Sequence, residues 1–216
     1  MIQHLSHDEF EILPNKLGGT TKKWLLKFKK NIRGVFKLDT DHDGNFLPWA
    51  NGKAEVAAFE LDQLLDLEVV PTTVLRTIGK DSGALQVFLN GKESPSHSVI
   101  LSRNFSRIQI LDYLIGNTDR KLENFLFWRE FNRGIAIDNG SGFNSNCLDG
   151  ELLKGYIKMD LALAHKIDSV SDEQIHQALA PYIEESAIHR TIERLHLLKS
   201  IHSNENLPHH STTHAY

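Results

Sequence analysis

The sequence contains a single cysteine, Cys147, among its 216 residues. One cysteine excludes internal disulfides and cysteine-rich zinc sites. No apolar run reaches the roughly 18 residues that a transmembrane helix requires, so we expect no membrane span. The first residues, MIQHLSHDEFEILPN, lack the basic start and apolar stretch of a secretory signal. We therefore expect a cytoplasmic protein, or one delivered into a host cell as an effector.

The chain also lacks a large excess of charge of either sign. The net charge is −4 and the pI is near 6.3, which favours neither nucleic acid nor an anionic membrane as a partner. The exception is the stretch 16–37, which carries eight Lys and Arg residues and no acidic residue. A solvated sheet face is the simplest interpretation of such a stretch. Apolar residues make up 40% of the chain, a usual value for a globular protein.

The hydrophobic pattern predicts an α+β fold, with strands concentrated in the first 90 residues and helices in the last 110. We expect two lobes, a strand-rich one over 1–89 and a helical one over 90–204, with a flexible tail at 205–216. A hinge is expected near 86–91. The expected helices cover 54–67, 102–115 and much of 151–203; the expected strands lie within 16–37, 69–78, 84–90, 124–128 and 134–140.

Two metal-like patterns carry little weight. The residues DTDHDG at 39–44 match the start of a calcium-binding EF-hand loop. That loop needs a bidentate carboxylate at its twelfth position, where this chain has Ala50. The histidines near the end of the chain are irregularly spaced, which is typical of incidental metal affinity.

The segment LDYLIGNTDRKLENFLFW, followed by IAIDNGSGF, is the most informative part of the sequence. Asp119 and Asn124 are five residues apart, and Asp138 ends an apolar strand. Oxygen ligands of this kind suit a hard divalent cation. In kinase-type phosphoryl transfer an Asp orients the acceptor hydroxyl, while an Asn and a second Asp hold the metal ions. The alternative is that all three are ordinary turn residues.

The first half of the chain contains matching features. Kinases place a strand lysine on the nucleotide phosphates and fix it with a glutamate from the next helix. Lys37 is predicted to end the strand GVFK, and Glu55 falls in the first turn of the next predicted helix. Lys121 could neutralise charge on the transferred phosphate. An upstream turn, whose backbone amides could cover phosphates, contains Gly18, Gly19, Thr20 and Thr21.

With these motifs the chain resembles the atypical kinases related to the phosphatidylinositol 3- and 4-kinases. The segments LDYLIGNTDRKLENFL and IAIDNG look most like the catalytic and metal-binding segments of type II phosphatidylinositol 4-kinases. AEVAAFELDQLLDLEVVPTTV is similar to Golgi casein kinases, and more distantly to HipA-type bacterial kinases. The resemblance covers about residues 17–143 and implies a two-lobed protein-kinase-like fold.

The resemblance also implies roles. Lys37 and Glu55 would form an ion pair, and Asp119 would be the catalytic base, with Lys121 beside it. Asn124 and Asp138 would be the metal ligands. A hinge at 86–89 would meet the adenine of ATP, through Gln86, Phe88 and Leu89. The implied cofactors are ATP with Mg²⁺ or Mn²⁺, and the implied partner is a hydroxyl acceptor.

The sequence departs from these families in places. DNG replaces the DFG of ordinary protein kinases, and no APE segment is present. The segment after Asp138 is nearly neutral, whereas lipid kinases hold a phosphorylated headgroup with cationic side chains. A protein Ser/Thr hydroxyl is therefore the favoured acceptor. A phosphoinositide or small-molecule kinase, an AMP transferase and a catalytically dead nucleotide-binding module remain alternatives.

Overall fold

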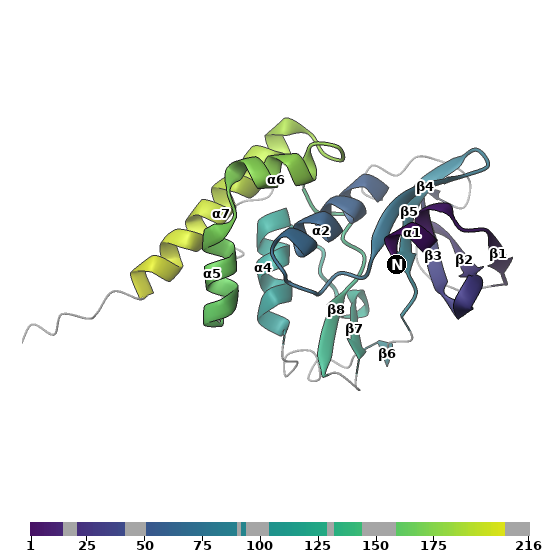
Figure 1. Cartoon of the computed structure of the whole chain (residues 1–216), viewed down its shortest axis with the longest axis horizontal. Coiled ribbons are helices and arrows are strands. Elements are labelled where there is room, and N and C mark those ends of the chain that lie inside the picture. The colour runs from purple at the N-terminus through teal and green to yellow at the C-terminus, as the bar shows by residue number, and fades with distance from the viewer. Residues whose placement is uncertain are drawn as a thin grey trace, which may run out of the picture.

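A computed structural model describes residues 1–14, 21–41, 51–89, 92–93, 104–128, 132–143 and 159–205. Figure 1 shows a large sheet at one end and most of the helices at the other. The helices are α1 (Ile2–His7), α2 (Gly52–Leu64), α4 (Phe105–Ile115), α5 (Leu161–Ser169), α6 (Asp172–Leu179) and α7 (Glu185–Glu205), with short 3₁₀ turns η1 (Lys29–Asn31) and η2 (Leu122–Asn124). The strands are β1 (Phe10–Leu13), β2 (Thr21–Phe28), β3 (Arg33–Asp41), β4 (Thr73–Ile78), β5 (Asp81–Val87), β6 (Lys92–Glu93), β7 (Phe125–Trp128) and β8 (Arg133–Ala136).

The large sheet has the strand order β1-β2-β3-β5-β4, and all its neighbouring strands are antiparallel. Alternate side chains of these strands point to opposite faces. One face packs against α1 and forms a small core that includes Leu5, Leu26, Phe36 and Leu85. The other face is covered by α2 over β4 and β5. A second sheet, of order β6-β7-β8, lies nearer the helices (Figure 1).

The larger core joins α2 to the helices that follow it. Ala57 and Leu61 of α2 belong to the same buried cluster as Leu111 of α4, Ile175 of α6 and Leu195 of α7. Figure 1 shows α2 between the large sheet and these helices. The two predicted lobes thus correspond in part to two cores, since α2 shares its core with the second. The boundary at residue 89 stays a prediction.

Most predicted elements are present, with corrections at their ends. The prediction that Lys37 ends its strand is wrong, because β3 continues to Asp41 and Lys37 is paired on both sides, with β2 and with β5. The expected turn 79–83 is shorter, since β5 already begins at Asp81. The sequence pattern missed α1 and β1. Helix α6 begins with a capping box, in which Ser171 and Gln174 are bonded reciprocally.

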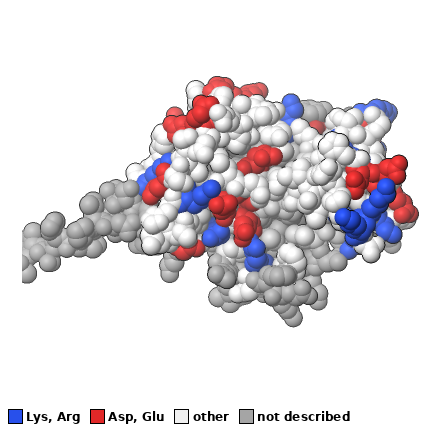
Figure 2. Space-filling view, viewed as in Figure 1, with Lys and Arg blue, Asp and Glu red and all other residues white. Residues whose placement is uncertain are grey.

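The basic stretch 16–37 does not form a uniform surface. Lys27 lies opposite Glu11 of β1, and the Lys29 ammonium lies 3.8 Å from a Glu9 carboxylate oxygen. Basic and acidic side chains accordingly lie together over β1 and β2 at the right of Figure 2. Lys23, Lys27 and Lys37 share one face of the sheet, and Lys23 and Lys37 are paired across the strands there. In the described part of the chain, each helix is too short or too polar to cross a membrane.

A buried carboxyl group holds the chain where it leaves α2. Asp62 is fully buried, and its Oδ1 accepts hydrogen bonds from the backbone N–H groups of Val69 and Val70 at 2.8 and 3.1 Å. Burial raises the pKa of Asp62 to about 6, because these donors offset only part of the lost hydration. The folded protein therefore binds this proton more tightly than the unfolded chain, where an Asp pKa is about 3.9.

We expect Asp62→Asn to remove a pH dependence of stability. The stabilisation from the bound proton is fully present below about pH 4 and is lost as pH rises through 6, a change of about 2 to 3 kcal/mol. Asn keeps the oxygen acceptor and cannot ionise. Urea unfolding between pH 4 and 7 should show the free energy of unfolding of the wild type falling relative to that of the variant. Parallel profiles for the two proteins would contradict this.

Candidate active site

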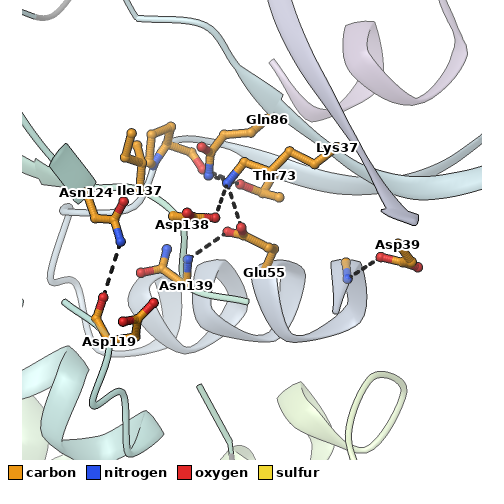
Figure 3. A network of polar contacts seen from close by, with 12 residues as sticks. Lys37, Asp39, Glu55, Thr73, Gln86, Asp119, Asn124, Ile137, Asp138 and Asn139 are labelled. Atoms are coloured by element: carbon orange, nitrogen blue, oxygen red, sulfur yellow. Dashed lines mark hydrogen bonds and ion pairs between the residues drawn. The ribbon is translucent and has the colours of Figure 1, made fainter. Parts of the chain in front are cut away.

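A lysine of the large sheet joins a helix to a loop. The Nζ of Lys37, on β3, lies 2.6 Å from Oε1 of Glu55 on α2 and 3.3 Å from Oδ1 of Asp138, just after β8 (Figure 3). The side chains of Lys37 and Glu55 are only 12% and 4% exposed, whereas that of Asp138 is 50% exposed. The structure thus pairs the lysine with the glutamate that the resemblance assigns to it.

The charges of this cluster reinforce one another. Burial acts to lower the pKa of Lys37, but the carboxylates of Glu55 and Asp138 outweigh it, so the pKa lies above its usual value. The ammonium groups of Lys37 and then Lys23 lower the pKa of Asp138, and this outweighs the opposite effect of its partial desolvation. At neutral pH the cluster therefore contains a cation that can bind phosphate and a carboxylate that can bind a metal ion.

The second oxygen of Glu55 fixes the loop that carries Asp138. Glu55 Oε2 accepts a hydrogen bond of 3.1 Å from the backbone N–H of Asn139 (Figure 3). Asn139 is fully buried. Asp138 itself has a φ of 62°, in the left-handed region that Asp and Asn enter more readily than other non-glycine residues. The DNG sequence is thus suited to this loop.

A buried arginine connects the loop to α4. Arg120 Nε and Nη2 donate to the Asp112 carboxylate at 3.0 and 2.7 Å, and the two side chains are only 9% and 13% exposed. The same guanidinium donates to the Ile137 carbonyl and to the Asn139 side-chain oxygen. Arg120 therefore holds the segment after β8 against α4.

The turn that carries Asp119 is built from the end of α4. The helix ends at Gly116, whose φ of 63° suits a residue without a Cβ. Asn117, only 2% exposed, accepts a 3.1 Å hydrogen bond from the Asp119 backbone N–H and donates one of 3.0 Å to Asp112. Sequence reasoning missed Asn117 and Asp112. The only local signal was Asn117 after a helix-ending glycine.

Asn124 and Lys121 lie on either side of Asp119. Asn124 Nδ2 donates to the Asp119 carbonyl at 3.3 Å, so its side-chain oxygen is the atom suited to a cation (Figure 3). Lys121 Nζ lies 2.9 Å from the Asp119 carboxylate, and both side chains are half exposed. The hydrogen bond that Lys121 donates to the Asp119 carboxylate is the main reason why the pKa of Lys121 is raised. The structure therefore places Lys121 directly on the predicted base.

The predicted hinge is engaged in protein contacts. Gln86 is 5% exposed and donates to the hydroxyl of Thr73 at 3.0 Å. The backbone N–H of Phe88 donates to the Arg33 carbonyl at 2.8 Å, and the Arg33 guanidinium lies over the Phe88 ring. Leu89 is half-buried. The backbone N–H of Phe88 is thus already used in a hydrogen bond to β3.

Other predicted features lie outside the described residues. These are the phosphate-covering turn at Gly18, Gly19 and Thr20, most of the EF-hand-like loop, Cys147, and the histidines of the tail. Thr21, which the sequence placed in the same turn, is the first residue of β2.

The donor atoms suit a metal ion that is shared with a ligand. Among the described residues, no three His, Cys, Asp or Glu side chains gather in a way that could hold an ion. Asp138 contributes carboxylate oxygens, and Asn124 contributes an amide oxygen. Mg²⁺ in phosphoryl-transfer sites is bound by one or two carboxylates and by substrate phosphates, and it keeps several waters. The residues present fit that kind of ion.

Comparisons with known proteins show which fold this chain has. No protein-family model matches the chain, and no curated protein matches its sequence. Among solved structures, a Golgi casein kinase superposes with a TM-score of 0.64 at 18% identity, over 97% of this chain and 75% of that chain. The fold is that of atypical kinases. A Fam20 structure from hydra, solved with sugar, has a TM-score of 0.64 at 15% identity over 94% of this chain and 87% of that one.

A bacterial kinase extends the likeness. The Helicobacter pylori proinflammatory kinase CtkA has a TM-score of 0.60 at 13% identity, over 95% of this chain and 99% of that chain. A second Golgi casein kinase structure, with Mn and ADP bound, has a TM-score of 0.60 at 19% identity and covers 92% of this chain and 74% of that one. The resemblance to Golgi casein kinases is thus confirmed at the level of the fold.

Proposed function

We propose that this protein transfers the γ-phosphoryl group of ATP to a hydroxyl acceptor. The observation that carries the proposal is the continuous contact from Glu55 through Lys37 to Asp138, since kinases need this lysine–glutamate pair and this aspartate together. Lys37 would bind the α- and β-phosphates. Asp138 and Asn124 would hold Mg²⁺ or Mn²⁺, which when bound neutralises charge on the phosphates.

Asp119 would take the proton of the acceptor. The acceptor oxygen forms a bond to the γ-phosphorus while the bond from that phosphorus to the β–γ bridging oxygen breaks, and ADP leaves. The proton of the hydroxyl passes to the Asp119 carboxylate. Lys121, 2.9 Å from that carboxylate, would move its ammonium group to the transferred phosphoryl group. Positioning and charge stabilisation would supply most of the rate.

The nucleotide would lie against the large sheet. We infer that adenine packs below Leu25 and Val35, which are half-buried and directly paired across β2 and β3. The segment 86–89 would form the edge of the adenine site and the boundary between the lobes. With the Phe88 N–H already bonded, adenine would meet the carbonyls of this segment and the amide of Leu89.

A protein Ser/Thr hydroxyl is the acceptor that we favour. A phosphoinositide headgroup carries several negative charges and requires cationic side chains after the metal-binding aspartate. The segment SGFNSNCLDGELLKG that follows Asn139-Gly140 is nearly neutral, with one cationic residue, Lys154, and two acidic ones. Support for this choice comes from composition, and the segment from 144 to 158 lies outside the described residues.

The test is the mass of the products. Purified protein is incubated with ATP and Mg²⁺ or Mn²⁺, alone, with protein extracts and with phosphoinositides. We expect ATP consumption and proteins heavier by one phosphate. Lys37→Met should lower the rate at least about 100-fold, because it removes a charge from the transferring phosphates. Lys53→Met is the matched control, since Lys53 is an exposed lysine of the same α2 region and should retain the rate.

Each other outcome identifies a different activity. An added mass of AMP would replace the proposal by AMP transfer, and label found only in phosphoinositides would replace it by a lipid kinase. If the protein binds nucleotide but turns over no ATP with either metal ion, the proposal would be replaced by that of a catalytically dead nucleotide-binding module.

A further inference from the structure

Two lysines face each other on the sheet. Lys23 of β2 and Lys37 of β3 are direct cross-strand partners in the antiparallel ladder. The side chains of such a pair leave the same face of the sheet, with their Cβ atoms about 5 Å apart, and like charges in this arrangement are destabilising. Lys23 is also half-buried. A sequence that keeps two ammonium groups in this position has an unfavourable pair unless an anion lies between them.

Among the described residues, helix α2 covers part of this face of the sheet. The next residue across from Lys37 is Ala84 of β5, and the start of α2 lies against it, since a Cβ on Gly52 would be 2.8 Å from the Ala84 nitrogen. Helix α2 packs on β4 and β5. The lysine pair is therefore beside the start of α2, where Glu55 contacts Lys37.

A second row of residues on this face differs in character from the lysine pair. Two positions along the strands from the lysines, Leu25 lies opposite Val35, and Val35 lies opposite Gln86. Two residues of a strand span about 7 Å. The face thus presents an apolar row next to the hinge and a cationic row beyond it, which is the order of base and phosphates in a nucleotide.

The carboxylates of Asp138 and Glu55 both act on the two lysines. The charges of Lys37 and Lys23 both act on the Asp138 carboxylate, and Lys37 Nζ also touches it. In the proposed function Asp138 holds a metal ion, and Glu55 continues to compensate Lys37. Phosphates bound at Lys37 would lie next to Lys23 as well, because the two side chains leave the same face of the sheet from paired positions.

We propose that Lys23 is a second phosphate-binding residue, which contacts the polyphosphate chain of the nucleotide beside Lys37. This inference rests on the proposed function. The neighbouring basic residues of β2 do not share this position. Lys22 Nζ lies 5.6 Å from the centre of the Trp24 ring, and Lys27 is exposed opposite Glu11 and Arg33.

Calorimetric titration with ATP and with adenosine tests the inference. Lys23→Met should weaken ATP binding about tenfold, the amount expected for a hydrogen bond to a charged group, and should leave adenosine binding unchanged. Lys23→Arg should bind ATP within about threefold of the wild type, since it retains the charge. Lys27→Met, on the same strand and face, is the control and should match the wild type.

The outcomes separate the inference from the proposed function. The wild type is expected to bind ATP more tightly than adenosine. If Lys23→Met shows the same preference for ATP as the wild type, the inference is wrong and the proposed function stands. An equal loss in Lys27→Met would also overturn it, because the effect would then come from overall charge. Equal losses of ATP and adenosine binding in both Lys23 variants would overturn it as well. A wild type that binds no ATP would overturn both proposals.

Discussion

Asp119→Asn should reduce phosphoryl transfer at least about 100-fold and leave the affinity for ATP unchanged. The amide has the shape of the carboxylate and cannot take the proton of the acceptor. Its backbone N–H would keep the bond to Asn117, so the turn should stay folded. Single-turnover rates, with ATP affinity measured in parallel, separate the two effects.

The control for this experiment is Glu123→Gln. Glu123 is an exposed carboxylate of η2, four residues from Asp119 in the same turn region. Its removal changes the local charge equally and should leave the rate within about twofold. A similar loss of rate in both variants would mean that charge, rather than proton transfer at Asp119, is responsible. An unchanged rate in Asp119→Asn would exclude Asp119 as the base.

Arg120→Met should destabilise the fold by about 3 to 5 kcal/mol, because it leaves the Asp112 carboxylate buried without its cation. The loss should appear as a lower urea midpoint with an unchanged slope. Arg133→Met is the matched control. Arg133 pairs with Glu68 at 2.7 Å, but the two side chains are 32% and 64% exposed, and such surface pairs contribute at most about 1 kcal/mol.

A double variant tests the cause of this destabilisation. Asp112→Asn combined with Arg120→Met removes both buried charges, and Asn retains an oxygen for the Asn117 amide. We expect the double variant to be more stable than Arg120→Met alone. If it is less stable, the uncompensated charge is not the reason, and the lost bonds to Ile137 and Asn139 dominate.

Local patterns predicted much of the fold and the main residues of the site. The helix containing Glu55, the strand containing Lys37 and the segment from Asp119 to Asp138 were all visible in the sequence, because periodicity and turn residues are local signals. The contact between Lys37 and Glu55 spans 18 positions, and it was expected only from the resemblance.

What could not be predicted depends on contacts between distant segments. The bond from Asn139 to Glu55 joins residues 84 positions apart. The partnership of Lys23 and Lys37 depends on strand register, and a bulge between Thr21 and Lys23 shifts that register. Helix α1 was missed because it is short, and its single buried residue, Leu5, gives no helical period.

Helix α2 packs both on the large sheet and in the core of the later helices, and this limits how far the helix can move. In many kinases activity is controlled by the position of the helix that carries the glutamate. Here that helix buries Phe59 and Leu61 with the later helices, and each buried side chain of this size contributes roughly 2 kcal/mol. Swinging α2 outward to separate Glu55 from Lys37 would break this core. In the proposed kinase the Lys37–Glu55 pair would therefore stay assembled without an activating step, and the rate would follow the amount of protein and of acceptor.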